Sequence, residues 1–234
     1  EEFYRKLPTF PAHPTTAAPS PQKFRAMYDA LADEGASHVL SIHISIALSA
    51  TVDMARMAAQ NTTSTQVTVI DSRQLSLGTG FLVETAAQMA EAGSSLAAIL
   101  ATLEGQIKRS RVFAALDTLE FLKRSGRMNK YVAGLATLLQ IKPILTMYDG
   151  QPGTERVRTR QRALRRVVEM LAAAGPPERL AIVHTHSPQS VDELRAMAAH
   201  LLPAGDIMAE DITPVIGAHI GPGVVGFAVV SARE

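Results

Sequence analysis

The stretch HVLSIHISIALSATVDMARMAAQ, residues 38–60, decides the fold class of this 234-residue chain. Its first seven residues form a short, mainly apolar run that predicts a buried strand. The polar elbow SIALSAT follows, and VDMARMAAQ has the spacing of a helix. The pattern then repeats, because VTVIDS at residues 67–72 reads as a second apolar strand with helical sequence after it. Alternating strands and helices predict an α/β fold with a mainly parallel sheet.

The sequence around these two strands supplies the covering helices. The segment SPQKFRAMYDALADEG, residues 20–35, begins with Ser20 as an N-cap and Pro21 at the first helical position, and it ends at Gly35. Two more helices are predicted at 80–93 and 94–109. The first 22 residues contain five prolines, so we expect a short helix followed by an extended segment.

The second half of the chain predicts a mixed sheet. A short strand and a helix fit residues 112–127, and NKYVAGLATLLQ at 129–140 predicts another helix. Two strands flank Asp149-Gly150, which is a hairpin signal and implies an antiparallel pair. Further helices are expected at 161–175 and 190–202, and further strands at 179–186, 206–212 and 224–232. We therefore expect two α/β domains, residues 1–110 and 111–234, with the ligand cavity at their interface.

Composition excludes several classes of function. The chain has 23 Lys and Arg against 22 Asp and Glu, so its net charge of +1 gives no long-range attraction to nucleic acid or to an anionic membrane. It contains no cysteine, which excludes disulfides and thiol catalysis and fits a reducing cytoplasm. The apolar run at 39–52 is shorter than the roughly 20 residues of a membrane-spanning helix. We expect a soluble, cytoplasmic protein.

The polar elbow after the first strand is a candidate anion site. Ser45, Ser49 and Thr51 follow a strand of an expected parallel sheet, where ligands meet the N-terminus of the next helix. The alternative is that Ser49 or Thr51 only caps the helix. The glycine-rich run and lysine of a phosphate-binding P-loop are absent.

Clustered arginines and histidines give weaker signals. The segment ERVRTRQRALRR, residues 155–166, has no aromatic residue for stacking on bases, so we expect no nucleic-acid partner. No histidine spacing matches a zinc motif, and we expect no metal and no cofactor. His219 lies in GAHIGPG, residues 217–223, which we interpret as a rigid turn. A lone loop histidine is usually structural, but it can also be a general acid or base.

Seven segments, read in order, resemble the DegV family of bacterial fatty-acid-binding proteins. They are PTTAAPSP, VLSIHISIALSAT, VTVIDSRQLSLGTG, LDTLEFLKRSGRMN, LLQIKPILTMYDG, RVRTRQRAL and VIGAHIGPGVVG. The resemblance covers nearly the whole chain. It implies two α/β domains that hold one long-chain fatty acid, such as palmitate, with its tail in an apolar tunnel. It also implies that the protein performs no chemistry alone and presents the acid to a separate fatty acid kinase.

The resemblance also implies ligand-binding residues. Thr16 and Ser49 take the places of the family's carboxylate-binding hydroxyls, with Ser45 as a competing choice. Arg158 and His219 match residues near the head group, and Arg127 matches the arginine of the family's glycine-arginine turn. The alternative is an acyl- or phosphoryl-transfer enzyme or a hydrolase that uses His219 as general acid or base.

Several positions depart from the family pattern. Ala17 and Ala18 replace a hydroxyl and an amide, Ala50 replaces glycine, and Ile220 replaces threonine. These changes imply a drier head-group pocket. The chain also starts after the point where a typical member has its first strand and helix, so we expect the first domain to lack them and its sheet to have an exposed edge.

Overall fold

The structure is a computed structural model that describes residues 2–128 and 141–233. The helices are α1 (Glu2–Lys6), α2 (Pro21–Asp33), α3 (Thr51–Gln60), α4 (Ser76–Glu91), α5 (Leu96–Arg109), α6 (Glu120–Arg124), α8 (Arg160–Ala173), α9 (Pro188–Ala198) and α10 (Pro214–Ile220). The strands are β1 (His38–His43), β2 (Gln66–Asp71), β3 (Ser110–Ala115), β4 (Lys142–Tyr148), β5 (Gln151–Val157), β6 (Pro177–His184), β7 (Met208–Asp211) and β8 (Val225–Ser231). Short 3-10 helices lie at Leu7–Thr9 and Ala199–Leu201. The predicted helix at 129–140 lies outside the described residues.

A two-stranded parallel sheet is formed by β1 and β2, in register from His38 opposite Gln66 to His43 opposite Asp71. Successive side chains of a strand point to opposite faces, and both faces are covered. Val39 packs with Tyr28 of α2 and Ala58 of α3, whereas Leu40 packs against a cluster from α4 and α5. This burial on both faces explains why the strand sequence is apolar with little alternation.

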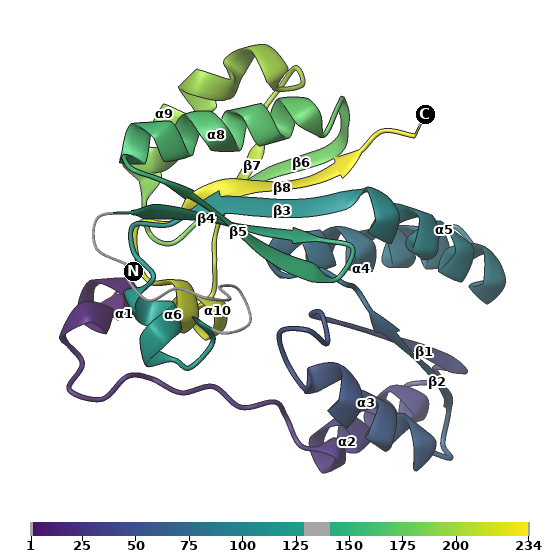
Figure 1. Cartoon of the computed structure of the whole chain (residues 1–234). Coiled ribbons are helices and arrows are strands. Elements are labelled where there is room, and N and C mark those ends of the chain that lie inside the picture. The colour runs from purple at the N-terminus through teal and green to yellow at the C-terminus, as the bar shows by residue number, and fades with distance from the viewer. Residues whose placement is uncertain (1, 129–140, 234) are drawn as a thin grey trace.

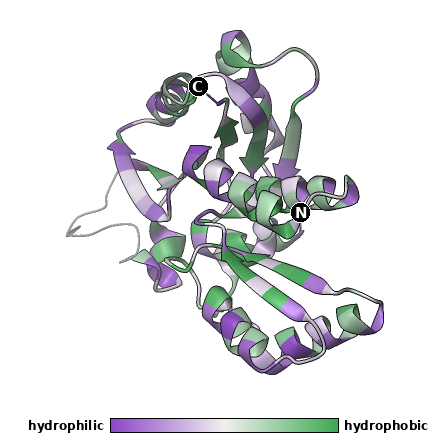
Figure 2. Cartoon of the chain, turned by 90° about the vertical axis from the view of Figure 1, so that its right-hand side faces the viewer, coloured by the Kyte–Doolittle hydropathy of each residue, from purple (hydrophilic) through white to green (hydrophobic). Residues whose placement is uncertain are grey.

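A six-stranded mixed sheet has the order β5-β4-β3-β8-β6-β7. Its pairs are antiparallel except for β6 with β7, and the predicted Asp149-Gly150 turn joins β4 to β5. Helices α8 and α9 cover one face, as Figure 1 shows above the sheet. The central strand β8 is hydrophobic along its length and buried from Val225 to Val230 (Figure 2). The expected mixed α/β fold with two sheets is therefore confirmed.

Helix α4 joins the two sheets. Phe81 belongs to the apolar cluster on the second face of the large sheet, whereas its neighbour Leu82 belongs to the cluster against the small sheet. Both side chains are at most 6% exposed. The same helix thus contributes to two cores, and together with α5 it fixes how the sheets are placed (Figure 1).

The remaining elements gather at one end of the large sheet. Helices α1, α6 and α10 lie together there, and an extended segment at 10–20 runs from them to α2 (Figure 1). The prediction of a rigid turn at 217–223 is wrong for residues 217–220, because these residues belong to α10. Pro214 occupies the start of that helix, where proline is favoured, and Gly221 ends it with a φ of 80°. Among the described residues, we find no helix with the length and hydrophobicity needed to span a membrane.

Candidate functional site

A pocket of about 540 Å³ lies where the extended segment, the elbow after β1 and α10 meet. This volume falls within the range of small-molecule sites, roughly 300–1,000 Å³. The described residues that line it are Thr16, Ala17, Ala18, Pro19, Ile44, Leu48, Ser49, Ala50, Thr51, Leu75, Leu122, Arg127, Val215, Ile216, His219 and Ile220. Four of the six predicted ligand-binding residues are among them: Thr16, Ser49, Arg127 and His219.

Thr16 and His219 are brought together across 203 positions of sequence. The Thr16 Oγ1 and the His219 Nε2 are 2.9 Å apart and form a hydrogen bond. Both residues are half-buried. If Nε2 carries the proton and donates to Oγ1, the threonine hydroxyl proton can be directed to a ligand oxygen. The bond also attaches the extended segment to α10.

Ser49 belongs to a second hydroxyl pair at the start of α3. Its Oγ lies 2.7 Å from the Thr51 Oγ1 and accepts a hydrogen bond of 3.3 Å from the Thr51 backbone N–H. The N-terminus of α3 adds the positive end of a helix dipole to this part of the pocket. Ser49 therefore accepts a hydrogen bond from the first residue of α3, just before which Ala50 is the N-cap, and it also lines the pocket; its contact with an anion stays a prediction.

Ser45 and Arg158 are placed differently. Ser45 is fully buried beneath the elbow, where its hydroxyl accepts a hydrogen bond from the Ala47 N–H, and it does not line the pocket. Arg158 is exposed and lies just after β5, which ends at Val157. Arg127 is half-buried in the pocket wall, and its Nη1 donates to the Ser125 carbonyl at 2.9 Å.

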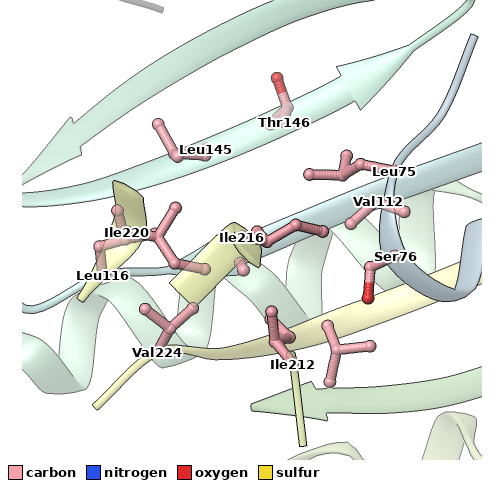
Figure 3. A pocket seen from close by; sticks show the side chains of 12 residues that line it. Leu75, Ser76, Val112, Leu116, Leu145, Thr146, Ile212, Ile216, Ile220 and Val224 are labelled. Carbon is pink, nitrogen blue, oxygen red and sulfur yellow. The ribbon is translucent and has the colours of Figure 1, made fainter. Parts of the chain in front are cut away.

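An apolar chamber lies beside this pocket, in the core above α10. Its volume is about 40 Å³, and Figure 3 shows Ile216 and Ile220 projecting into it from α10 opposite the strands of the large sheet. Leu75, Ile216 and Ile220 line both the pocket and the chamber. The other lining residues are Ser76, Val112, Ala114, Leu116, Leu145, Thr146, Val183, Ile212 and Val224.

The glycines around His219 are places of close approach. A Cβ atom on Gly221 would lie 2.2 Å from the Phe121 ring, and one on Gly223 would lie 2.2 Å from Asp117 Oδ2. Both glycines also have φ near 80°, which other residues adopt with difficulty.

At the other end of α10, the Tyr4 hydroxyl donates to the carbonyls of Ile212 and Thr213. Burial, with a smaller effect of Asp211, raises the Tyr4 pKa and keeps this donor protonated.

The sequence named Thr51 both as a hydroxyl of the candidate anion site and as a possible cap; the resemblance implied an apolar tunnel, but no residue of the chamber was named. The spacing of Ile216 and Ile220, one helical turn apart, is the signal that could have indicated an apolar face, but it depends on recognising α10 as a helix. The departures from the family pattern do gather here, since Ala17, Ala18 and Ala50 line the pocket. In the described part of the chain, no three His, Asp or Glu side chains are grouped so that they could hold a metal ion.

The fold and the pocket define an α/β protein with two sheets and a polar pocket beside an apolar chamber. The chain belongs to the DegV family, a family of uncharacterised proteins whose profile matches residues 1–232. A DegV domain-containing protein of Deinococcus radiodurans is 38% identical over 226 residues, which cover 93% of this chain and 78% of that protein. The protein SCO2569 of Streptomyces coelicolor is 33% identical over 223 residues, with 94% and 79% covered.

Solved structures share the fold and have been described as fatty acid binding. A DegV family protein from Thermus thermophilus, described for its fatty acid binding, is 36% identical with a TM-score of 0.86, and the match covers 99% of this chain and 84% of that one. DegV of Bacillus subtilis, a fatty acid binding protein, is 30% identical with a TM-score of 0.82, with 98% and 83% covered.

Proposed function

We propose that this protein binds one long-chain fatty acid, with the carboxylate in the polar pocket and the acyl chain in the apolar chamber. The observation that carries the proposal is that the pocket and the chamber are neighbours, because both are lined by Leu75, Ile216 and Ile220, which form a shared wall. A ligand with one anionic end and one long apolar end matches this combination. The fatty acid binding of structural relatives supports the same assignment.

The carboxylate is bound by paired hydroxyls. Thr16 and Ser49 each donate to a carboxylate oxygen, and His219 and Thr51 orient the two hydroxyls through the hydrogen bonds of 2.9 and 2.7 Å. Arg127 and the N-terminus of α3 supply positive potential. These partners are needed because a carboxylate that leaves water without hydrogen bonds is costly. Arg158 and Ser45 lie outside the pocket lining, so we assign neither a direct contact.

The acyl chain supplies most of the affinity, at roughly 0.8 kcal/mol for each buried methylene. A chamber of about 40 Å³ holds only a few water-sized spheres of roughly 10–15 Å³ each. A long tail therefore enters only if side chains of the shared wall move. Binding should accordingly be coupled to a local opening of this wall.

We further propose that the bound acid is presented to a separate fatty acid kinase. Val215 lines the pocket and is 63% exposed, and Ala17 beside it is exposed as well, so the carboxylate end faces the surface. The carboxylate oxygen would attack the γ-phosphoryl group of ATP held by the kinase, which yields an acyl phosphate and ADP.

Lipid extraction tests the proposal directly. The purified protein should release close to one fatty acid per chain on extraction and mass spectrometry, and the delipidated protein should take up added acid. Acyl phosphate should form only when a kinase and ATP are added. No bound lipid and no uptake would refute the binding function, whereas turnover by the isolated chain that is lost in His219→Ala would favour the enzyme alternative.

A further inference from the structure

We propose that Arg73 and Asp149 form a clasp that positions Leu75 between the polar pocket and the apolar chamber, and so sets the rate at which an acyl chain enters and leaves. Arg73 lies in the loop between β2 and α4, and Asp149 lies in the turn between β4 and β5. The inference rests on the proposed function for its ligand, but the clasp itself is a property of the structure without ligand.

The clasp consists of three contacts between the two turns. The Arg73 Nη1 donates to the Asp149 Oδ1 at 2.7 Å, and the Gly150 backbone N–H donates to the Arg73 carbonyl at 3.1 Å. The aliphatic part of the Arg73 side chain also packs against Gly150, where an added Cβ would lie 3.5 Å from the Arg73 Cβ and Cγ. The contact therefore combines an ion pair, a backbone hydrogen bond and packing.

The loop that carries Leu75 needs such outside support. Arg73 has a φ of 52° and Ser76 a φ of 48°, both in the left-handed region that residues with a side chain adopt at a cost. Backbone conformations of this kind persist when neighbouring structure holds them. Leu75 lies between these two residues, so its position depends on whether the loop keeps this shape.

The same loop is connected to both walls of the ligand site. The Gln74 carbonyl accepts a hydrogen bond of 2.8 Å from the Ser45 N–H at the start of the elbow that leads to Ser49. The Gln74 Nε2 donates to the Ser110 carbonyl, at the start of β3, at 2.8 Å. Movement of this loop would therefore displace residues of the polar pocket as well as residues of the chamber.

The clasp joins two parts of the chamber lining that come from different segments of the chain. Leu75 and Ser76 come from the clasped loop, whereas Leu145 and Thr146 come from β4, the strand that leads to the Asp149 turn. Figure 3 shows Leu75 and Thr146 at the same end of the space. Holding the turn against the loop therefore keeps these two walls together, and releasing it allows Leu75 to swing away from Ile216.

A reversible disulfide tests the clasp. An ideal Cβ at position 150 lies 3.5 Å from the Arg73 Cβ, within the 3.5–4.5 Å found in disulfides, and the natural chain has no cysteine that could compete. In Arg73→Cys/Gly150→Cys, release of bound cis-parinaric acid should be at least tenfold slower in the oxidised protein than after reduction. Equal rates in the two redox states would overturn the proposal, and each single cysteine variant is the control for the oxidant.

A charge-swap pair gives a second test that needs no disulfide. Arg73→Asp and Asp149→Arg should each speed release by about two- to fivefold, as expected for loss of one exposed ion pair, and the double swap should restore the rate to within about twofold. If the double variant instead releases the ligand faster than either single variant, with the two effects adding, the result would contradict the clasp.

Hydrogen exchange separates this inference from the proposed function. Oxidation of the cysteine pair should slow amide exchange in residues 72–76 without ligand and leave α8 unchanged. If neither redox form takes up fatty acid, the proposed function fails, and the exchange rates of the loop still decide whether the clasp holds Leu75. Unchanged exchange in this loop would overturn the clasp whatever the ligand.

Discussion

Tyr4 packs so closely on Gly217 that a Cβ atom at position 217 would lie 2.2 Å from the phenolic oxygen. The same oxygen donates to the Ile212 carbonyl just before α10, so α1 holds the start of α10 through a hydrogen bond and a steric contact. Tyr4 is 4% exposed. Because His219 lies two residues beyond Gly217, this contact fixes the imidazole in the pocket wall.

Gly217→Ala should therefore destabilise the protein and weaken ligand binding together. The added methyl group cannot be accommodated without displacing Tyr4, and overpacking of this kind costs about 1–3 kcal/mol. Urea unfolding measures the stability, and titration with a fatty acid measures the affinity. Gly105→Ala is the matched control, since no atom outside its own helix backbone lies within 4 Å of the new Cβ, and alanine there should stabilise α5 by roughly 0.5–1 kcal/mol. Equal effects at both positions would refute the steric account.

Removal of the pocket hydroxyls should discriminate between an acid and an alcohol. Thr16→Ala and Ser49→Ala each delete a donor to the carboxylate, and hydrogen bonds to charged groups contribute about 1.5–3 kcal/mol. Calorimetric titration should show a loss of about tenfold to a hundredfold in affinity for palmitate but a much smaller loss for hexadecanol. Thr62→Ala is the control, because its hydroxyl donates to the Ala58 carbonyl near the end of α3 and Thr62 is not among the described residues that line the pocket. Parallel losses for both ligands would show that these hydroxyls do not bind the head group.

The order of strands and helices could be predicted from local sequence because each signal is local. The apolar strand predicted at 38–44 and observed at 38–43, the helix start at Ser20-Pro21 and the Asp149-Gly150 turn all depend on neighbouring residues only, and the structure confirms them. The mixed character of the large sheet followed from the hairpin. Local patterns of this kind decided the fold class.

The ligand site was less predictable because it is built from contacts between distant segments. Nothing near Thr16 in the sequence indicates that its hydroxyl meets His219, and nothing near Gly217 indicates that Tyr4 occupies the space of a Cβ. The glycines at 217–223 suggested a turn, whereas Gly217 is a helical residue that admits a neighbouring ring. Long-range packing decided these positions. Local sequence patterns do not indicate it, and it was the resemblance to the DegV family that placed Thr16 and His219 at the same head group.

Filling the chamber should exclude long tails. Ala114 lines the chamber from β3 and is 8% exposed. In Ala114→Leu, the added carbon atoms would occupy the space of about 40 Å³ and compete with the acyl chain. We expect affinity for palmitate to fall by at least tenfold, whereas an eight-carbon acid should lose much less because it buries fewer methylenes beyond the shared wall. Thermal melting with each acid measures this, and an equal loss for both acids would argue that the tail does not use this chamber.

Stability should decrease below neutral pH through His43. Its Nε2 lies 2.6 Å from the Ser41 Oγ, which in turn lies 2.7 Å from the buried Tyr28 hydroxyl, so a serine proton directed to Nε2 suits a neutral imidazole. Burial lowers the His43 pKa below its ordinary value of about 6.5. Because the His43 pKa is higher in the unfolded chain than in the folded protein, the unfolded chain binds this proton first as the pH falls. The free energy of unfolding therefore has its full value above about pH 6.5 and decreases at lower pH.

Urea unfolding at several pH values between 7.5 and 5 should show a smaller loss of stability for His43→Gln than for the wild type. His200→Gln, at an exposed position, is the control and should behave like the wild type. If the free energy of unfolding depends on pH in His43→Gln as it does in the wild type, His43 is not the titrating group.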